Sequence, residues 1–173
     1  MGKIYKLGEI CEIRSGKTPS TQNKEYWENG TIPWFTQTEI TTQTLNSKKF
    51  ITQKAVKECG IPLTTKNSVL LCNINEAITF YSGISGLSCN QQVFVLEPNI
   101  DKIDTNYLYH LLCAVKSKLN LFMRGTIFKS LTKTELKRVS ISLPSLSEQN
   151  QILQKFQIVY NKLFICNDMC SKA

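Results

Sequence analysis

The sequence predicts an α+β fold, in which a β-rich body over residues 1–144 precedes one long C-terminal coiled-coil helix over residues 145–173. Between residues 61 and 98, short apolar runs alternate with Gly, Pro and Asn, as strands alternate with turns. After Pro144 the chain contains neither Gly nor Pro, and its apolar residues follow the 4-3-4-3-4 spacing of a coiled-coil seam: Ile152, Phe156, Val159, Leu163, Cys166 and Cys170. Such a helix needs a partner helix, from this chain or another, unless it folds back on the body.

The charge balance favours a polyanionic partner. Twenty-one Lys and Arg residues against 13 Asp and Glu residues give a formal charge of +8 and a pI near 9.1. Nucleic acid and anionic membrane surfaces both attract such a protein, although a soluble protein without such a partner can have the same composition. No run of 18 apolar residues is present and the N-terminus lacks an apolar segment, so we expect neither a membrane span nor a signal peptide.

Cysteine usage indicates a reducing compartment and no metal site. The seven Cys residues form no CxxC pair and lie mostly among apolar neighbours, so we expect reduced, buried thiols in a cytoplasmic protein. The chain has one His, His110, and no paired-ligand spacing, so we expect no zinc site.

The N-terminal segment predicts a short helix or strand followed by a loop that could contact phosphate. Apolar residues between Leu7 and Ile13 indicate one or two helical turns or the start of a strand. The following loop, residues 14–21, offers the charges of Arg14 and Lys17, the Thr18 hydroxyl and a Gly that permits close backbone approach. The alternative is an ordinary surface turn, because the Walker spacing is absent.

Residues 25–60 contain an aromatic and polar segment that could read bases. The sequence Trp34-Phe-Thr-Gln37 predicts a strand that carries Trp34, Thr36 and Gln37 towards DNA, although at least one of the two Trp residues is expected in the core. A helix is predicted over residues 52–58. The neighbouring lysines, including Lys48 and Lys49, are expected to be solvated and to make non-specific phosphate contacts at most.

Three strands are predicted next, over residues 68–72, 77–81 and 92–96. Amide side chains lie beside them, and we select Asn73, Asn90 and Gln91 as candidate base readers because an amide can pair bidentately with adenine. The same residue types are also common at turns and strand ends, which is the more frequent reason for their presence.

The last part of the body predicts two helices and a strand. Asp104 caps a helix from Thr105 to about residue 123, with His110 off its apolar stripe and structural rather than catalytic. The basic loop that follows carries Arg124 and Lys129, which could hold phosphates or guanine edges. Capping boxes at residues 132–135 and 145–148 start a short helix and the long C-terminal helix, with a strand over 139–143 between them.

Catalytic patterns are missing from the sequence. One His, scattered acidic residues and the lack of a Gly-rich cofactor loop leave no arrangement for nucleophilic, metal or cofactor chemistry. We therefore expect a binding protein.

Six segments occur in an order that resembles the specificity subunits of type I restriction–modification systems. They are residues 7–19 (LGEICEIRSGKTP), 26–34 (YWENGTIPW), 89–92 (CNQQ), 107–112 (YLYHLL), 125–129 (GTIFK) and 141–149 (ISLPSLSEQ). The resemblance covers essentially the whole chain. It departs from the family pattern at Pro144-Ser145, where Pro-Pro is frequent, at the Gly125 loop, and at Gln92, where Gly is common.

The resemblance implies a bacterial or archaeal DNA-recognition subunit that is not itself an enzyme. Residues 1–144 would be a target-recognition domain that reads one half-site of double-stranded DNA. Residues 145–173 would be a spacer helix that pairs antiparallel with a second copy, so that a homodimer rebuilds the family's usual two-domain architecture. S-adenosylmethionine, and ATP with Mg, would belong to the partner methyltransferase and motor/nuclease subunits, and this chain would bind no cofactor. The remaining alternatives are a basic coiled-coil adaptor without sequence-specific DNA binding and an enzyme completed across a dimer.

Overall fold

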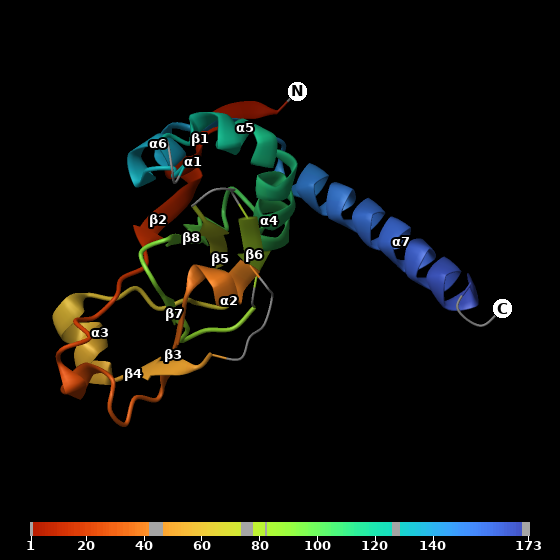
Figure 1. Cartoon of the computed structure of the whole chain (residues 1–173). Coiled ribbons are helices and arrows are strands. Elements are labelled where there is room, and N and C mark those ends of the chain that lie inside the picture. The colour runs from red at the N-terminus through yellow and green to blue at the C-terminus, as the bar shows by residue number, and fades with distance from the viewer. Residues whose placement is uncertain (1, 42–46, 74–77, 82, 126–128, 171–173) are drawn as a thin grey trace.

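The computed structural model describes residues 2–41, 47–73, 78–81, 83–125 and 129–170, and within them the side chains of 41, 78–81 and 161–170 are not described. Within these residues the body contains three small sheets, and one long helix leaves it (Figure 1). The strands are β1 (Lys3–Lys6), β2 (Cys11–Ser15), β3 (Ile32–Phe35), β4 (Lys49–Ile51), β5 (Val69–Cys72), β6 (Ile78–Tyr81), β7 (Ser88–Cys89), β8 (Val93–Pro98) and β9 (Ser140–Leu143). The α+β class is confirmed.

The helices between these strands are mostly short. They are α1 (Leu7–Ile10), the 3-10 turn η1 (Lys24–Tyr26), α2 (Gln37–Thr41), α3 (Gln53–Cys59), α4 (Thr105–Ala114), α5 (Lys116–Phe122), α6 (Lys133–Arg138) and α7 (Leu146–Cys170). The Thr52 and Asp104 side chains accept hydrogen bonds from the first backbone N–H groups of α3 and α4, and a capping box starts α6. The predicted helix starts after residues 52, 104 and 132 are thus confirmed.

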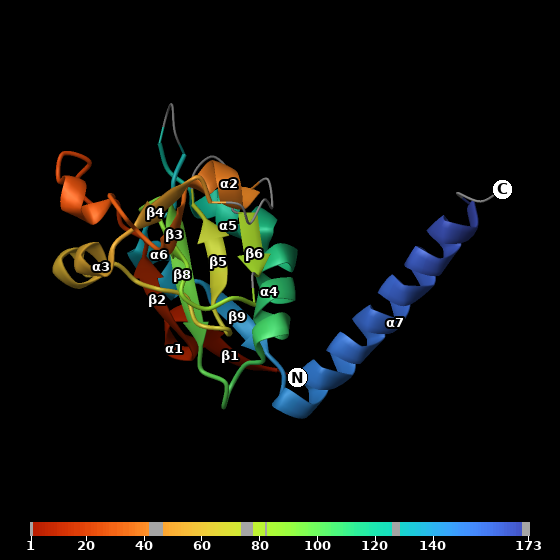
Figure 2. The ribbon, with the colours of Figure 1, turned by 90° about the horizontal axis from the view of Figure 1, so that it is seen from below.

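The central sheet has four antiparallel strands in the order β2-β8-β5-β6. A second sheet joins β4, β3 and β7, in which β3 pairs antiparallel with β4 and parallel with β7. The third pairs the N-terminal β1 with β9, the last strand before α7. Figure 2 shows α2 at the end towards which the β5 arrow points, whereas α7 leaves from the opposite end of the body.

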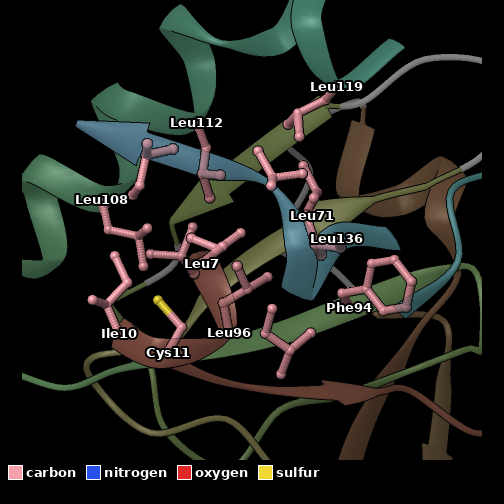
Figure 3. Close-up of a cluster of buried hydrophobic side chains, with 14 of the residues drawn as sticks. Leu7, Ile10, Cys11, Leu71, Phe94, Leu96, Leu108, Leu112, Leu119 and Leu136 are labelled. Carbon is pink, nitrogen blue, oxygen red and sulfur yellow. The ribbon is translucent and has the colours of Figure 1, made fainter. Parts of the chain in front are cut away.

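One face of the central sheet and the helices above it form the main core (Figure 3). Leu71 and Leu96 from the sheet meet Leu7 and Ile10 from α1 and Leu108 from α4. Burial raises the pKa of the Cys11 thiol, which lies in this core, to about 12, so this cysteine stays protonated and packs as a small apolar side chain.

The predicted helix over residues 105–123 is wrong in its continuity, because it breaks at Val115 into α4 and α5. Val115 has φ −92° and ψ 9°, outside helical geometry, and its N–H still bonds to the Leu111 carbonyl. After the break, Leu119 of α5 is fully buried while Leu121 faces solvent. Neither Gly nor Pro marks this site, so the apolar periodicity gave no warning of it.

Helix α7 is anchored at its first turn by Gln149, whose side chain is fully buried. Its amide oxygen accepts a hydrogen bond from the Asp104 N–H at 2.9 Å. Its amide nitrogen donates to the Lys102 and Pro144 carbonyls, each at 2.9 Å. One side chain therefore links α7 to Lys102 and Asp104, which precede α4, and to Pro144, which precedes α7. These bonds fix the direction in which α7 leaves the body.

We expect Gln149→Ala to lower the free energy of unfolding by about 1–3 kcal/mol, because three buried backbone groups would lose their partner. Chemical denaturation would measure this change. Gln154→Ala, on the exposed side of the same helix, is the control and should have little effect. Equal costs for the two variants would contradict the anchoring role.

The capping box of α7 gives a dependence of stability on pH. Hydrogen bonds from the Ser145 hydroxyl and its backbone N–H to the Glu148 carboxylate hold the pKa of Glu148 below its ordinary value. This group therefore stabilises the folded protein above the ordinary pKa of 4.5 and loses that contribution as the pH falls through the lowered folded value. Glu148→Gln keeps an acceptor without the charge, so its Tm should fall less than that of the parent protein between about pH 5 and pH 3. If the Tm of Glu148→Gln and that of the parent protein fell equally with pH, this role of Glu148 would be contradicted.

Candidate nucleic-acid interface

Five chain segments meet at one end of the central sheet, which we call the loop edge: residues 16–18, 36–37, 73, 90–92 and 129–131. The end of β2 pairs with the start of β8, and the end of β5 pairs with the same start of β8. The ends of β3 and β7 are joined through the hydrogen bond from Asn90 N–H to the Phe35 carbonyl at 2.9 Å. Segments far apart in the sequence are thus brought together.

Further backbone hydrogen bonds complete the loop edge. The Lys17 N–H donates to the Cys89 carbonyl at 2.9 Å, and the Asn73 N–H donates to the Gln92 carbonyl at 3.0 Å. The Leu131 N–H donates to the Asn73 carbonyl at 3.1 Å, which adds the base of the hairpin that follows α5. The loop edge is therefore a hydrogen-bonded framework and not a set of independent loops.

Gly16 is required by this framework. A Cβ at this position would lie 2.2 Å from the Asn90 carbonyl oxygen and 2.5 Å from that of Cys89. The sequence suggested that this Gly permits approach to a phosphate. The structure instead shows an approach between two segments of the same chain, which leaves no room for any side chain.

Several predicted residues present exposed groups at or beside this edge. Lys17 is exposed, and its ammonium donates to the Cys59 carbonyl at 2.9 Å. Thr18 and Gln91 are exposed and bonded to each other, from the hydroxyl to the amide oxygen at 2.6 Å. Arg124 and Lys129 are exposed at the two sides of the hairpin, whose pairing joins Arg124 to Ser130. Residues 126–128 lie outside the described part of the chain.

Other predicted residues are buried and make hydrogen bonds within the framework of the loop edge. Asn73 and Asn90 are 7% and 9% exposed. The Asn90 amide nitrogen donates a hydrogen bond to the Gln92 side-chain oxygen, and the Asn90 amide oxygen accepts one from the Gln92 N–H. Trp34 is 4% exposed, and its indole N–H donates to the Lys17 carbonyl at 2.9 Å. DNA contact by Asn73 and Asn90 stays a prediction, whereas the burial of Trp34 and its internal hydrogen bond argue against DNA contact by Trp34.

The predicted strand Trp34–Gln37 ends early. Strand β3 stops at Phe35, and Gln37 is the first residue of α2. Thr36 forms a capping box with Glu39, because its N–H and hydroxyl both bond the Glu39 carboxylate, at 2.7 and 2.8 Å. Thr36 and Gln37 are half-exposed and lie at the start of a helix, where their side chains border the loop edge.

Like Arg124, whose Nε lies 3.4 Å from the Glu135 carboxylate, Arg14 differs from Lys17 and Lys129 because its charge has carboxylate partners within the chain. Its guanidinium lies 3.3 Å from the Glu97 carboxylate and 3.7 Å from that of Glu12. Glu97 also accepts hydrogen bonds from the Ser68 and Thr65 hydroxyls. Arg14 therefore has less free charge to offer a phosphate than Lys17 or Lys129.

Sequence reasoning missed Gln149, Gln92 and Glu97, whose side chains position these elements; Gln149 is fully buried, whereas Gln92 and Glu97 are half-buried. For Gln149 a signal was available, because it precedes Ile152 by three residues and so continues the apolar seam of α7 backwards. A polar residue at that position indicates a specific buried hydrogen bond.

The residues that the structure describes contain no group of three or more His, Cys, Asp and Glu side chains that could bind a metal. Within the same residues, no helix has the length and apolarity needed to cross a membrane.

Solved structures of type I restriction–modification chains share this fold. The crystal structure of the HsdS subunit from Thermoanaerobacter tengcongensis superposes with a TM-score of 0.70 at 20% identity, over 94% of this chain and 38% of that one. A chain from a structure of an assembled type I R-M system gives a TM-score of 0.71 at 21% identity, over 95% of this chain and 39% of that chain. These similarities define a class of fold.

Sequence comparison defines the family. Residues 3–167 match the model for the type I restriction modification DNA specificity domain, so the chain belongs to that family. It is 34% identical over 157 residues to the type I restriction enzyme MjaIX specificity subunit of Methanocaldococcus jannaschii, covering 86% of this chain and 35% of that protein. It is 29% identical over 168 residues to the EcoR124I/EcoR124II specificity subunit of Escherichia coli, covering 91% and 41%. The chain thus spans well under half the length of these relatives.

We expect Gly16→Ala to disturb the loop edge, because two carbonyl oxygens occupy the space of the new methyl group. The cost should be about 1–3 kcal/mol in the free energy of unfolding, measured by chemical denaturation. Thr18→Ala removes only an exposed hydrogen bond two residues later and should cost less than about 0.5 kcal/mol. A Gly16→Ala protein as stable as the parent would contradict the close approach.

Proposed function

We propose that this chain recognises one half-site of a bipartite, double-stranded DNA target within a type I restriction–modification complex. The observation that carries the proposal is the convergence of basic and amide side chains at the loop edge of a domain from the specificity family. Lys17, Arg124 and Lys129 would contact phosphates or guanine edges. Gln37 and Gln91 would pair with adenine edges, since an amide can both donate and accept a hydrogen bond.

The chain would supply recognition and no chemistry. A methyltransferase subunit carrying S-adenosylmethionine would modify the DNA, and a motor/nuclease subunit using ATP and Mg would cleave it. Support for these partners is family membership. A cytoplasmic location follows from the same proposal, because the DNA and the partner subunits are there.

Helix α7 would serve as spacer and assembly surface by pairing antiparallel with α7 of a second copy. Within the described part of the helix, Phe156 and Val159 of the predicted seam are 51% and 55% exposed. Phe156 stacks one face on His110, with ring centroids 5.0 Å apart. A groove of about 550 Å³ lies between α4 and α7 and continues this apolar surface. The side chains of Leu163, Cys166 and Cys170 lie outside the described residues.

The DNA-reading proposal predicts that selection from a random duplex library will enrich a defined half-site, with the methyltransferase subunit present. The affinity should fall steeply with salt, because each phosphate contact releases counterions. Arg124→Gln should weaken binding, whereas Lys155→Gln, on α7 away from the loop edge, should not. Failure to enrich any sequence would favour the basic adaptor alternative.

The pairing of α7 predicts a particle of twice the 19.7 kDa mass of one chain in light scattering. Val159→Glu puts a charge on the exposed apolar stripe and should give a monomer. Gln154→Glu, on the other side of the helix, should leave the dimer intact. If the parent protein is a monomer, the two-fold arrangement is wrong. Half-site recognition would then be tested separately.

A further inference from the structure

A second basic surface lies beside the loop edge, in a pocket between η1 and β4. Its volume is about 390 Å³. The lining includes three lysines, two aromatic side chains and one carboxylate: Lys24, Lys48, Lys49, Trp27, Phe50 and Glu28. From the sequence, Lys48 and Lys49 are expected to be solvated and to make non-specific phosphate contacts at most. The structure adds that both line one pocket together with Lys24.

Lys49 is held in place by the two tryptophans. Its ammonium lies 6.0 Å from the ring centroid of Trp27 and 5.9 Å from that of Trp34. The two rings meet edge to face, with centroids 5.3 Å apart and an interplanar angle of 85°. Each indole N–H is also fixed, to the Ser20 carbonyl for Trp27 and to the Lys17 carbonyl for Trp34. The ammonium is therefore positioned before any ligand arrives.

The charges of the pocket favour a phosphate over a base. Its lining carries three lysines and one carboxylate, Glu28, which lies 3.9 Å from Lys24 in an exposed pair. Lys49 lies over both tryptophan rings, so Phe50, which is 42% exposed, is the lining aromatic side chain left for a base to stack on. A phosphate group needs only cations, and an ordered ammonium loses little freedom on binding it.

Trp34 connects the pocket to the loop edge. Lys49 pairs with Trp34 between β4 and β3, and Trp34 lies two residues before Thr36. The same Trp34 holds the Lys17 carbonyl. A duplex lying across the loop edge would thus bring its backbone past this pocket.

We propose that Lys49, with Lys24 and Lys48, binds a backbone phosphate of double-stranded DNA beside the half-site. The inference rests on the proposed DNA-reading function and adds a contact that fixes the position of the duplex without reading its sequence. The paired tryptophans act as positioning residues for Lys49.

The test is the salt dependence of duplex binding by the full chain with the methyltransferase subunit present, measured by fluorescence anisotropy on selected and scrambled sequences. Lys49→Gln should weaken binding to both by the same factor and make the slope of log K against log salt less negative by about 1. Lys49→Arg should keep the parent slope, because Arg retains the charge and the aromatic contact.

Lys3→Gln is the matched control. Lys3 also lies over an aromatic ring, 5.2 Å from the Tyr5 centroid, but it belongs to β1, at the end of the body from which α7 leaves (Figure 2). If Lys49→Gln and Lys3→Gln share the parent slope while the parent protein still prefers its selected sequence, the phosphate site is wrong and the proposed function stands. If the parent protein binds no duplex at any salt concentration, both proposals fail.

Discussion

The close contact between Gly16 and the segment after β7 is the constraint on which the rest of the candidate interface depends. Because no Cβ lies between them, the loop after β2 can bond directly to Cys89, and its residue Lys17 in turn receives the indole of Trp34. The central sheet and the β4-β3-β7 sheet are thereby joined at one end. A larger residue would separate them, and the exposed side chains at that end would no longer share one surface.

The buried amide of Gln149 has a corresponding role at the opposite end of the body. A helix that leaves a domain can pivot unless its first turn is fixed, and here three hydrogen bonds from one side chain fix it. The β1–β9 pairing reinforces this junction, because the strand before α7 is held by the N-terminal strand. In the proposed assembly, the angle of α7 sets the distance between two half-sites, so a rigid junction would translate into a fixed spacer.

Charge in this protein has two uses that the composition cannot separate. Arg14 is balanced by Glu12 and Glu97 and contributes to the stability of the sheet. Lys17 and Lys49 are instead ordered by a carbonyl and by aromatic rings, which leaves their net charge uncompensated at these contacts. An ammonium ordered in this way keeps its attraction for phosphate, whereas an ion-paired guanidinium must first give up a carboxylate partner.

The sequence by itself determined the elements with strong local signals. Capping residues at 52, 104, 132 and 145 and the apolar runs of β5 and β8 act within a few residues, so each could be identified without knowing the fold. The order of six motifs indicated the family. Tertiary structure decided the break at Val115, the early end of β3, the burial of Trp34 and the pairing of Arg14 with Glu97. These features depend on residues distant in the chain, because burial and charge neutralisation are set by neighbours that only folding brings together.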